Sequence, residues 1–413
     1  MRTPVPEYLQ EVIDDLTDIR DGDVADYIPD LATADPERFG IALATVGGRV
    51  HVAGDADVEF SIQSVSKPFV YAAALLDRGF ERVLDSVGVE PSGEAFDELS
   101  LEADSHRPKN PMINAGAITT HQLLLGEHAT GEERVARAVE FLSELAGRRL
   151  EIDESVKRSE LDTADRNLAL AHLLRNYRVF STGAHEVVEG YTAQCSILVT
   201  ARDLAVMGAT LANGGVQPLT GAQVMPGDVA RQTLSVMAAA GMYDAAGTWF
   251  SGVGIPAKSG VSGGMLGVLP GQVGIGVFSP RLDSHGNSVR GVEACRRLST
   301  DMNLHLMASD AAGTASVRDI EYDDNEIRVV LQGTIQFSGA ENIVDRLQTV
   351  EPGDTTILFD VRRVDRFLDV GRRMTLEGMR RLRLDGHPIA LYDPDQRLPS
   401  PDMGDGHFPE QRA

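Results

Sequence analysis

Lysine, cysteine and long apolar runs are all scarce in this chain of 413 residues. It holds four lysines, so 34 of its 38 basic residues are arginines. The two cysteines, Cys195 and Cys295, lie a hundred residues apart, and no C-x-x-C pair is present. We therefore expect buried free thiols in a reducing compartment and no disulfide framework. The histidines form no H-x-x-H or H-E-x-x-H pattern, so the sequence predicts no metal site.

The lack of long apolar runs and the net charge disfavour several locations and partners. No stretch approaches the 18 apolar residues that would predict a membrane span. The N-terminal sequence MRTPVPEYLQEVIDDL lacks a basic stretch followed by an apolar run, so no secretory signal is indicated and we expect a cytoplasmic protein. The formal net charge is −24, which repels phosphate backbones and disfavours nucleic-acid binding. This charge does not restrict binding of a small zwitterionic molecule.

Two β-like regions frame a long helical region in the first 308 residues. Residues 39–54 alternate around Gly47-Gly48 and predict a hairpin. Residues 253–280 are glycine-rich and β-like, with turns. Strands at both ends of a segment can join one antiparallel sheet covered by helices, which is an α+β layout. Helical periodicity is found at 6–20, 64–76, 130–146, 163–176, 199–213, 226–240 and 289–307.

The C-terminal quarter of the chain has a different pattern. After a first domain over 1–308, the small polar residues 309–316 predict a linker. A compact α/β module is predicted over 317–395. Residues 396–413 are rich in proline, glycine and acids, and we expect a disordered tail. Within the module the predicted strands are 326–335, 355–361 and 388–393, and the predicted helices are 340–350 and 366–384.

Ser64 and Lys67 form an S-x-x-K pattern at the start of a predicted helix. A serine hydroxyl becomes a strong nucleophile only when a base removes its proton, and a lysine three residues later lies on the same helix face. That lysine must be neutral to act, which requires burial or a neighbouring cation. Pro68 fits the first helical turn, where a missing N–H costs little. By itself the pattern is weak, because an N-cap serine with a surface lysine explains it equally simply.

A second motif, Lys258-Ser259-Gly260, resembles the K-T-G element that follows S-x-x-K in β-lactamases and penicillin-binding proteins. Such a strand lines one side of the site and brings a second cation near the first, which helps to keep Lys67 neutral. Gly260 is expected to let the substrate approach the backbone. Half of the chain's lysines thus fall in two motifs in the expected order, which favours a functional interpretation of both.

The same region allows one competing interpretation, a phosphate-binding loop. GVGIPAKS at 252–259 nearly matches G-x-x-x-x-G-K-[ST]. However, Ala257 replaces the second glycine, and the following GVSGGMLG cannot open a good helix to hold a phosphate. We therefore disfavour this interpretation.

Six further polar residues are candidates for a site, although each has a structural explanation when taken singly. An asparagine can cap a helix, a glutamate or asparagine at a helix end can be solvated, and a tyrosine can lie in the core with a satisfied hydroxyl. The six are Tyr27, Asn114, Glu160, Asn167, Tyr191 and Tyr243.

Taken together, seven segments resemble the serine-dependent glutaminase family, in matching order and spacing over roughly residues 20 to 300. The segments are ADYIPDLA around Tyr27, FSIQSVSKP around Ser64, NPMINAGAI around Asn114, SELDTADRN from Ser159 to Asn167, YTAQCS from Tyr191, GMYD around Tyr243 and PAKSGVSGG around Val261.

This resemblance implies a β-lactamase/transpeptidase-like α+β domain that hydrolyses L-glutamine to L-glutamate and ammonia. Ser64 would be the nucleophile that carries a γ-glutamyl ester, and Lys67 its general base. Tyr191 and Tyr243 would lie at the reaction centre, and the N–H groups of Ser64 and Val261 would form the oxyanion hole. The residues implied to bind the substrate are Tyr27, Ser64, Asn114, Glu160, Asn167, Tyr191, Tyr243 and Val261.

The resemblance also bears on cofactors and assembly. It implies no organic cofactor and no metal. Because family members form homodimers or homotetramers, we expect a homo-oligomer here. Glutamate at position 160 suits an α-ammonium group, and asparagines at 114 and 167 can donate to a carboxylate.

The C-terminal module resembles a sulfate-transporter/anti-sigma-antagonist (STAS) domain in segments 329–341, 355–365 and 385–393. Many such domains place a phosphorylatable Ser or Thr after an aspartate at the start of a helix. The equivalent run here, Asp369-Val370-Gly371-Arg372, lacks the hydroxyl, so we do not expect a phosphorylation switch. Two roles stay open: binding an unknown protein or ligand, or simply adding stability or an oligomer contact.

Two other functions are compatible with parts of this pattern. A β-lactamase or D,D-peptidase shares the S-x-x-K and K-[ST]-G motifs and would react with penicillins, but those enzymes work outside the cytoplasm. A STAS-type regulatory protein would sense glutamine without turning it over. The intact Ser64–Lys67 pair argues against such a sensor.

Overall fold

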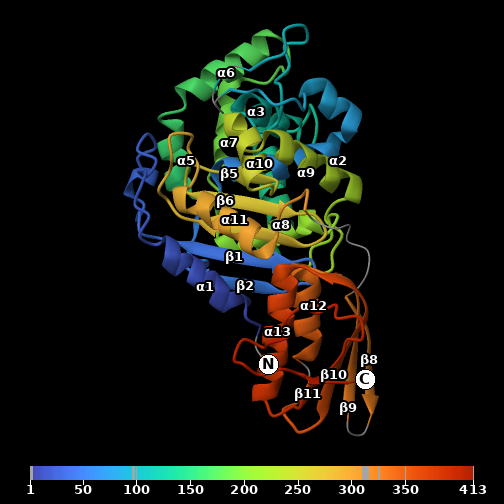
Figure 1. Ribbon diagram of the computed structural model, residues 1–413. Helices are drawn as coiled ribbons and strands as arrows, with labels where there is room; N and C mark the ends of the chain where they lie inside the picture. The colour runs from blue at the N-terminus through green and yellow to red at the C-terminus, as the bar shows by residue number, and fades with distance from the viewer. Residues whose placement is uncertain are drawn as a thin grey trace. The chain divides into compact units, whose positions relative to one another are not determined.

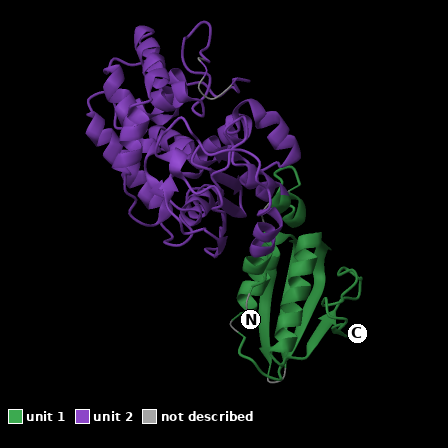
Figure 2. Cartoon of the chain, turned by 90° about the vertical axis from the view of Figure 1, so that its left-hand side faces the viewer, with its two compact units in different colours: residues 1–8, 297–413 green, residues 9–296 purple. Residues whose placement is uncertain are grey.

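The computed structural model divides into two compact units (Figure 2). It describes residues 3–94, 98, 100–308, 316–323, 326–348 and 350–412. The larger unit comprises residues 9–296, and the smaller unit comprises residues 1–8 with 297–413. The division thus falls earlier than the predicted domain end at 308. Of the predicted linker 309–316, only Ser316 belongs to the described residues.

A five-stranded antiparallel sheet forms the centre of the larger unit, in the order β2-β1-β7-β6-β5. The predicted hairpin supplies β1 and β2, and the glycine-rich region supplies β5, β6 and β7, so the two regions join one sheet as predicted. Two short strands, β3 and β4, pair separately. The bounds are β1 Gly40–Thr45, β2 Val50–Gly54, β3 Phe60–Ser61, β4 Leu198–Val199, β5 Ala257–Ser259, β6 Gly264–Leu269 and β7 Val273–Phe278.

Helices cover both faces of this sheet, and others gather beside it, among them α3, α6 and α7 (Figure 1). The α-helices are α1 Val5–Leu16, α2 Ser66–Ser86, α3 Asn114–Leu123, α4 Gly131–Ala146, α5 Glu154–Leu161, α6 Asp165–Asn176, α7 Ala184–Cys195, α8 Ala201–Ala212, α9 Gly227–Ala240, α10 Ala246–Gly252 and α11 Val289–Met302. The short 3₁₀ helices are η1 Leu31–Thr33, η2 Gln63–Val65 and η3 Tyr243–Ala245.

Glycines in β7 let helix α8 pack closely on one face of the sheet. A Cβ at Gly276 would lie 1.9 Å from the carbonyl oxygen of Ala201, and one at Gly274 would lie 2.2 Å from that of Ala205. On β6, Leu266 contacts α8 while the preceding residue, Met265, contacts α11. Because successive strand residues point to opposite faces, α8 and α11 lie on opposite sides of the sheet.

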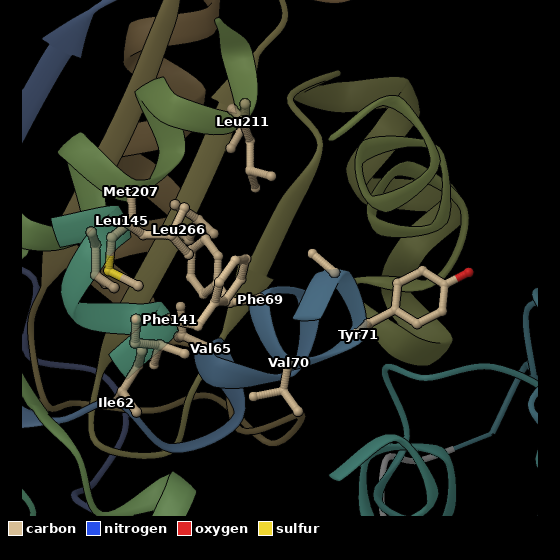
Figure 3. Packing of buried hydrophobic residues seen from close by; sticks show 14 of the residues in the cluster. Ile62, Val65, Phe69, Val70, Tyr71, Phe141, Leu145, Met207, Leu211 and Leu266 are labelled. Atoms are coloured by element: carbon tan, nitrogen blue, oxygen red, sulfur yellow. The ribbon is translucent and has the colours of Figure 1, made fainter. Parts of the chain in front are cut away.

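Helix α2 is central to the core of the larger unit. Every residue from Ser66 to Leu75 is buried. Figure 3 shows Val65, Phe69 and Leu266 among the buried side chains that surround its first turns, with others from α4 and α8. The regular helix breaks at Gly79, where φ is +76°, close to the predicted end at 76. The segment that carries the S-x-x-K pattern is therefore held on all sides.

The smaller unit is an α/β module with a five-stranded sheet in the order β12-β11-β10-β9-β8. Strands β9 to β12 are parallel and β8 is antiparallel. The crossovers through α12 and α13 move in the same direction across the sheet, and crossovers of this kind are right-handed, so both helices cover one face. The bounds are β8 Val317–Asp323, β9 Glu326–Ile335, α12 Phe337–Leu347, β10 Thr356–Phe367, α13 Asp369–Leu384, β11 Ile389–Tyr392 and β12 Glu410–Gln411.

The C-terminal tail differs from the expected disorder over 396–413. Its described part packs through two apolar side chains, Leu398 and Met403, which are 3% and 2% exposed. The Asp393 carboxylate accepts hydrogen bonds from the backbone N–H groups of Arg397 and Leu398. Strand β12 then extends the sheet beside β11. The polar composition of this segment predicted disorder, but two buried apolar residues are enough to hold a short polar segment in place.

Among the described residues, no helix is both long enough and apolar enough to cross a bilayer.

Phe69→Ala should lower the free energy of unfolding of the larger unit by about 3–5 kcal/mol, because it leaves a cavity among fully buried side chains. The only tryptophan, Trp249, is buried in this unit, so its fluorescence during urea unfolding reports on it. Leu219→Ala, at a side chain that is 51% exposed, is the control and should change little. A loss below about 1 kcal/mol for Phe69→Ala would contradict the packing described here.

Candidate active site

Seven of the nine predicted site residues line one cavity of about 240 Å³ in the larger unit. A groove of about 1470 Å³ along α4 and α7 is larger but contains none of the nine. The seven are Tyr27, Ser64, Asn114, Glu160, Asn167, Tyr191 and Val261. The other residues that line the cavity are Ile28, Gln63, Thr163, Ala164 and Arg166.

Ser64 lies in η2, directly before the first turn of α2. The preceding residue, Gln63, has a φ of +50°, a conformation that a non-glycine residue adopts only when its surroundings hold it. A Cβ at Gly260 would lie 3.1 Å from the Ile62 carbonyl oxygen and 3.3 Å from Gln63 Cβ. The glycine after β5 therefore accommodates the Ser64 segment, whereas we expected it to accommodate the substrate.

Lys67 and Tyr243, the remaining two predicted residues, lie next to this cavity. Lys67 is fully buried on α2, and its Nζ donates a hydrogen bond of 2.7 Å to Asn114 Oδ1. The same Nζ is 3.5 Å from the hydroxyl of Tyr243, which lies in η3. Asn114 Nδ2 in turn donates to Asn167 Oδ1 at 2.9 Å. One amide thus joins the lysine of the S-x-x-K pattern to a residue on α6.

The second lysine motif also contributes a side chain next to Lys67 and Tyr243. Lys258 is fully buried on β5, with its Nζ 4.0 Å from the centroid of the Tyr243 ring, and Lys67 Nζ is 5.5 Å from the same centroid. Burial, and then the charge of Lys67, lower the pKa of Lys258 well below its usual value. Its Nζ donates to the Ser259 carbonyl oxygen at 2.7 Å. Two ammonium groups in this buried space do not both keep a full charge.

Strand β5 leads into β6 rather than into a helix. The region around Lys258 therefore has no helix N-terminus to receive a phosphate, as we expected when we disfavoured the phosphate-binding loop.

Glu160 has a perturbed carboxyl group in the wall of the cavity. Burial near the end of α5 raises its pKa to about 7, against the opposing effects of Gln63 and Lys67. Gln63 Nε2 donates to Glu160 Oε2 at 3.1 Å and lies 3.3 Å from Ser61 Oγ. The residue before the predicted nucleophile thus orients a candidate ligand for the substrate.

A buried hydrogen-bond network lies behind Ser64. Ser66 Oγ donates to the Gln63 carbonyl oxygen at 2.8 Å and accepts from Gln194 Nε2 at 2.8 Å. Gln194 Oε1 is 2.9 Å from His121 Nδ1. Burial lowers the pKa of His121 to about 4, so the neutral ring donates its Nδ1–H to Gln194. This network stabilises the backbone of Gln63, which carries the unusual φ.

Tyr191 extends the same polar region from α7. Burial raises the pKa of Tyr191 well above its usual value, as does the neighbouring Cys195. The Cys195 thiol lies beside Tyr191 and Ser66, and burial raises its pKa as well. Both groups therefore stay protonated at neutral pH and act through hydrogen bonds.

The residues that sequence reasoning missed are those of the supporting network. Gln63 precedes Ser64 and Gln194 lies inside YTAQCS, so the matching segments contained them, but no spacing rule marked them as partners. The missed residues are Gln63, Ser66, His121 and Gln194.

Two backbone donors face no acceptor in this region. The N–H groups of Ser64 and Val261 make no hydrogen bond within the part of the chain that the structure describes. Both residues line the cavity. Unpaired donors at a cavity wall can receive negative charge on a bound molecule.

Comparison with known proteins shows which family this chain belongs to. The Glutaminase family model matches residues 22–307. The chain is 52% identical over 406 residues to a glutaminase from Corynebacterium efficiens, covering 98% of this chain and 95% of that protein. It is 51% identical over 410 residues to a glutaminase from Corynebacterium glutamicum, covering 99% of each. These two alignments include the C-terminal module, which lies beyond the family model.

Solved structures agree with the sequence relatives. A structure of the protein Mglu has a TM-score of 0.75 and 58% identity, covering 96% of this chain and 100% of that one. A probable glutaminase from Bacillus subtilis has a TM-score of 0.68 and 34% identity, covering 74% of this chain and 99% of that one. The larger unit therefore defines a hydrolase with a β-lactamase-like α+β fold. The chain belongs to the glutaminase family, and it is an enzyme that hydrolyses glutamine.

Proposed function

We propose that Ser64 and Lys67 carry out this hydrolysis as nucleophile and general base. The observation that carries the proposal is the placement of Ser64 on the cavity wall, with Lys67 buried one turn further along the chain. The Ser64 hydroxyl oxygen attacks the side-chain amide carbon of glutamine, and its proton passes to neutral Lys67. Ammonia leaves after protonation, and the γ-glutamyl ester on Ser64 remains. Water then hydrolyses this ester to glutamate.

The oxyanion of each tetrahedral intermediate is received by the N–H groups of Ser64 and Val261. Their lack of other partners among the described residues supports this role. Tyr243 lies within 3.5 Å of Lys67 Nζ and is suited to pass the proton to the leaving ammonia. Lys258 shares the buried space with Lys67, and two amines in this space do not both keep a full charge.

Other residues of the cavity wall bind the amino-acid end of glutamine. Glu160 in its ionised form pairs with the α-ammonium group, and Asn114 with Asn167 donates to the α-carboxylate. Tyr27 and Tyr191 complete the wall. Structures of Mglu include a glutamate form, at 53% identity to this chain, which supports a cavity shaped for the amino-acid product.

Ser64→Ala and Lys67→Ala should each reduce ammonia release from L-glutamine by roughly 10³-fold or more, because either change removes half of the nucleophile and base pair. Lys157→Ala is the matched control, since this lysine forms surface ion pairs outside the cavity, and it should retain parental turnover. Wild-type-like kcat in either Ser64→Ala or Lys67→Ala would refute the assignment.

The pH dependence of kcat/KM should show an inflection near pH 7. Below it activity falls, because protonated Glu160 no longer forms an ion pair with the α-ammonium group of glutamine. Gln63→Leu removes a hydrogen bond that lowers the Glu160 pKa, so the inflection should move to higher pH. Glu160→Gln should abolish this inflection and lower kcat/KM. If the profile keeps the same inflection in both variants, another group titrates there and the role of Glu160 is wrong.

We also propose that the enzyme is a cytoplasmic homodimer or homotetramer and that its C-terminal unit is STAS-like. Both cysteines are free and buried, as a reducing compartment favours. The mixed sheet with two helices on one face supports the STAS-like assignment. Sedimentation velocity should return a multiple of the 44.5 kDa chain mass, and a single-chain mass would contradict it. The same measurement on a chain ending at residue 308 tells whether the C-terminal unit makes the oligomer contact.

A further inference from the structure

A second cavity in the larger unit gathers four arginines. It has a volume of about 480 Å³ and lies where α2, α3 and α6 end. Arg78 and Arg82 come from α2, Arg175 from the last turn of α6, and Arg178 from the segment that follows. Among the described residues, Glu127 is the one acidic residue in the lining. A positive cavity of this kind is unexpected in a chain whose net charge is −24.

Three of these arginines have no carboxylate partner among the described residues. Glu127 pairs with Arg82 at 3.4 Å. Arg78, Arg175 and Arg178 form no ion pair within the described part of the chain, although acidic residues outnumber basic ones by 62 to 38. An arginine in a last helical turn stabilises the helix dipole. That effect accounts for Arg175 but not for four arginines in the lining of one cavity, of which Arg82, Arg175 and Arg178 are exposed to solvent.

The position of Arg78 depends on a glycine. A Cβ at residue 126 would lie 2.1 Å from Arg78 Nη1, and Gly126 has a φ of +93°. The absence of a side chain at 126 therefore leaves the space that the guanidinium group occupies. Near it, Gln122 Nε2 donates to Thr182 Oγ1, so a hydroxyl and an amide add neutral hydrogen-bonding groups to the charged lining.

The chemistry of this lining selects its ligand. Guanidinium groups present planar pairs of donors that match phosphate oxygens. One phosphate group carries a charge of about −1.5 to −2, which leaves three uncompensated arginines only partly neutralised. Two linked phosphate groups balance them, and the volume accommodates a molecule larger than one phosphate ion. We propose that this cavity binds a small anion that carries a diphosphate group, inorganic or attached to a nucleoside.

Isothermal titration calorimetry of the full chain with pyrophosphate, ADP and orthophosphate, at constant ionic strength without divalent cations, tests the proposal. The parent should bind pyrophosphate, ADP or both saturably, and orthophosphate at least tenfold more weakly. Binding of both probes identifies the diphosphate group itself as the ligand chemistry, and binding of ADP alone identifies the nucleoside form.

The variant Arg175→Gln/Arg178→Gln should bind whichever of pyrophosphate and ADP the parent binds at least tenfold more weakly. The control, Arg149→Gln/Arg231→Gln, removes two exposed arginines outside this cavity and should bind like the parent. Ammonia release by both variants confirms that they are folded. The proposal is overturned if the parent binds neither probe saturably, if orthophosphate binds as tightly as pyrophosphate, or if the two double variants bind equally.

Discussion

Burial of the Lys67 side chain is the constraint on which the rest of the site depends. A lysine amine in a close-packed core is costly when charged, so it needs partners or must give up its proton. Here Asn114 Oδ1 accepts from it at 2.7 Å, and the Tyr243 hydroxyl lies at 3.5 Å. Both partners come from other elements, α3 and η3. Helix α2 can therefore bury its first turns only if these elements pack against it in this arrangement.

Buried polar groups around Lys67 also need hydrogen-bond partners, and amide side chains supply them. Asn114 links Lys67 to Asn167, and Gln63 links the Ser64 segment to Glu160. A carboxamide suits these positions because one end accepts while the other donates, without adding a charge to the buried region. Partly satisfied polar networks are costly in low dielectric. The positive φ of Gln63 persists because Ser66 Oγ donates to the Gln63 carbonyl oxygen and is itself held by a hydrogen bond from Gln194 Nε2.

The sequence was informative where local patterns coincide with chemistry, and less so where contacts are remote. The alternation around Gly47-Gly48 and the glycine-rich strands predicted a single antiparallel sheet. The segments that match the glutaminase family predicted Glu160 as a site residue, and it lines the same cavity as Ser64. The partners Gln63–Glu160, Ser66–Gln194 and His121–Gln194 are separated by 97, 128 and 73 residues, and no periodicity relates positions so far apart. The tail was missed for a similar reason, because Leu398 and Met403 find their contacts only in the folded module.

The unequal use of lysine and arginine follows from what each can do. An arginine stays protonated in proteins, whereas burial readily lowers the pKa of a lysine. Two of the four lysines, Lys67 and Lys258, are fully buried beside Tyr243, where burial favours a neutral amine. In surface ion pairs the planar donor pair of an arginine matches a carboxylate, and arginines form most of these pairs, such as Arg202 with Asp57. The arginines of the second cavity keep their charge because a guanidinium group does not lose its proton, and this charge suits an anion from outside the chain.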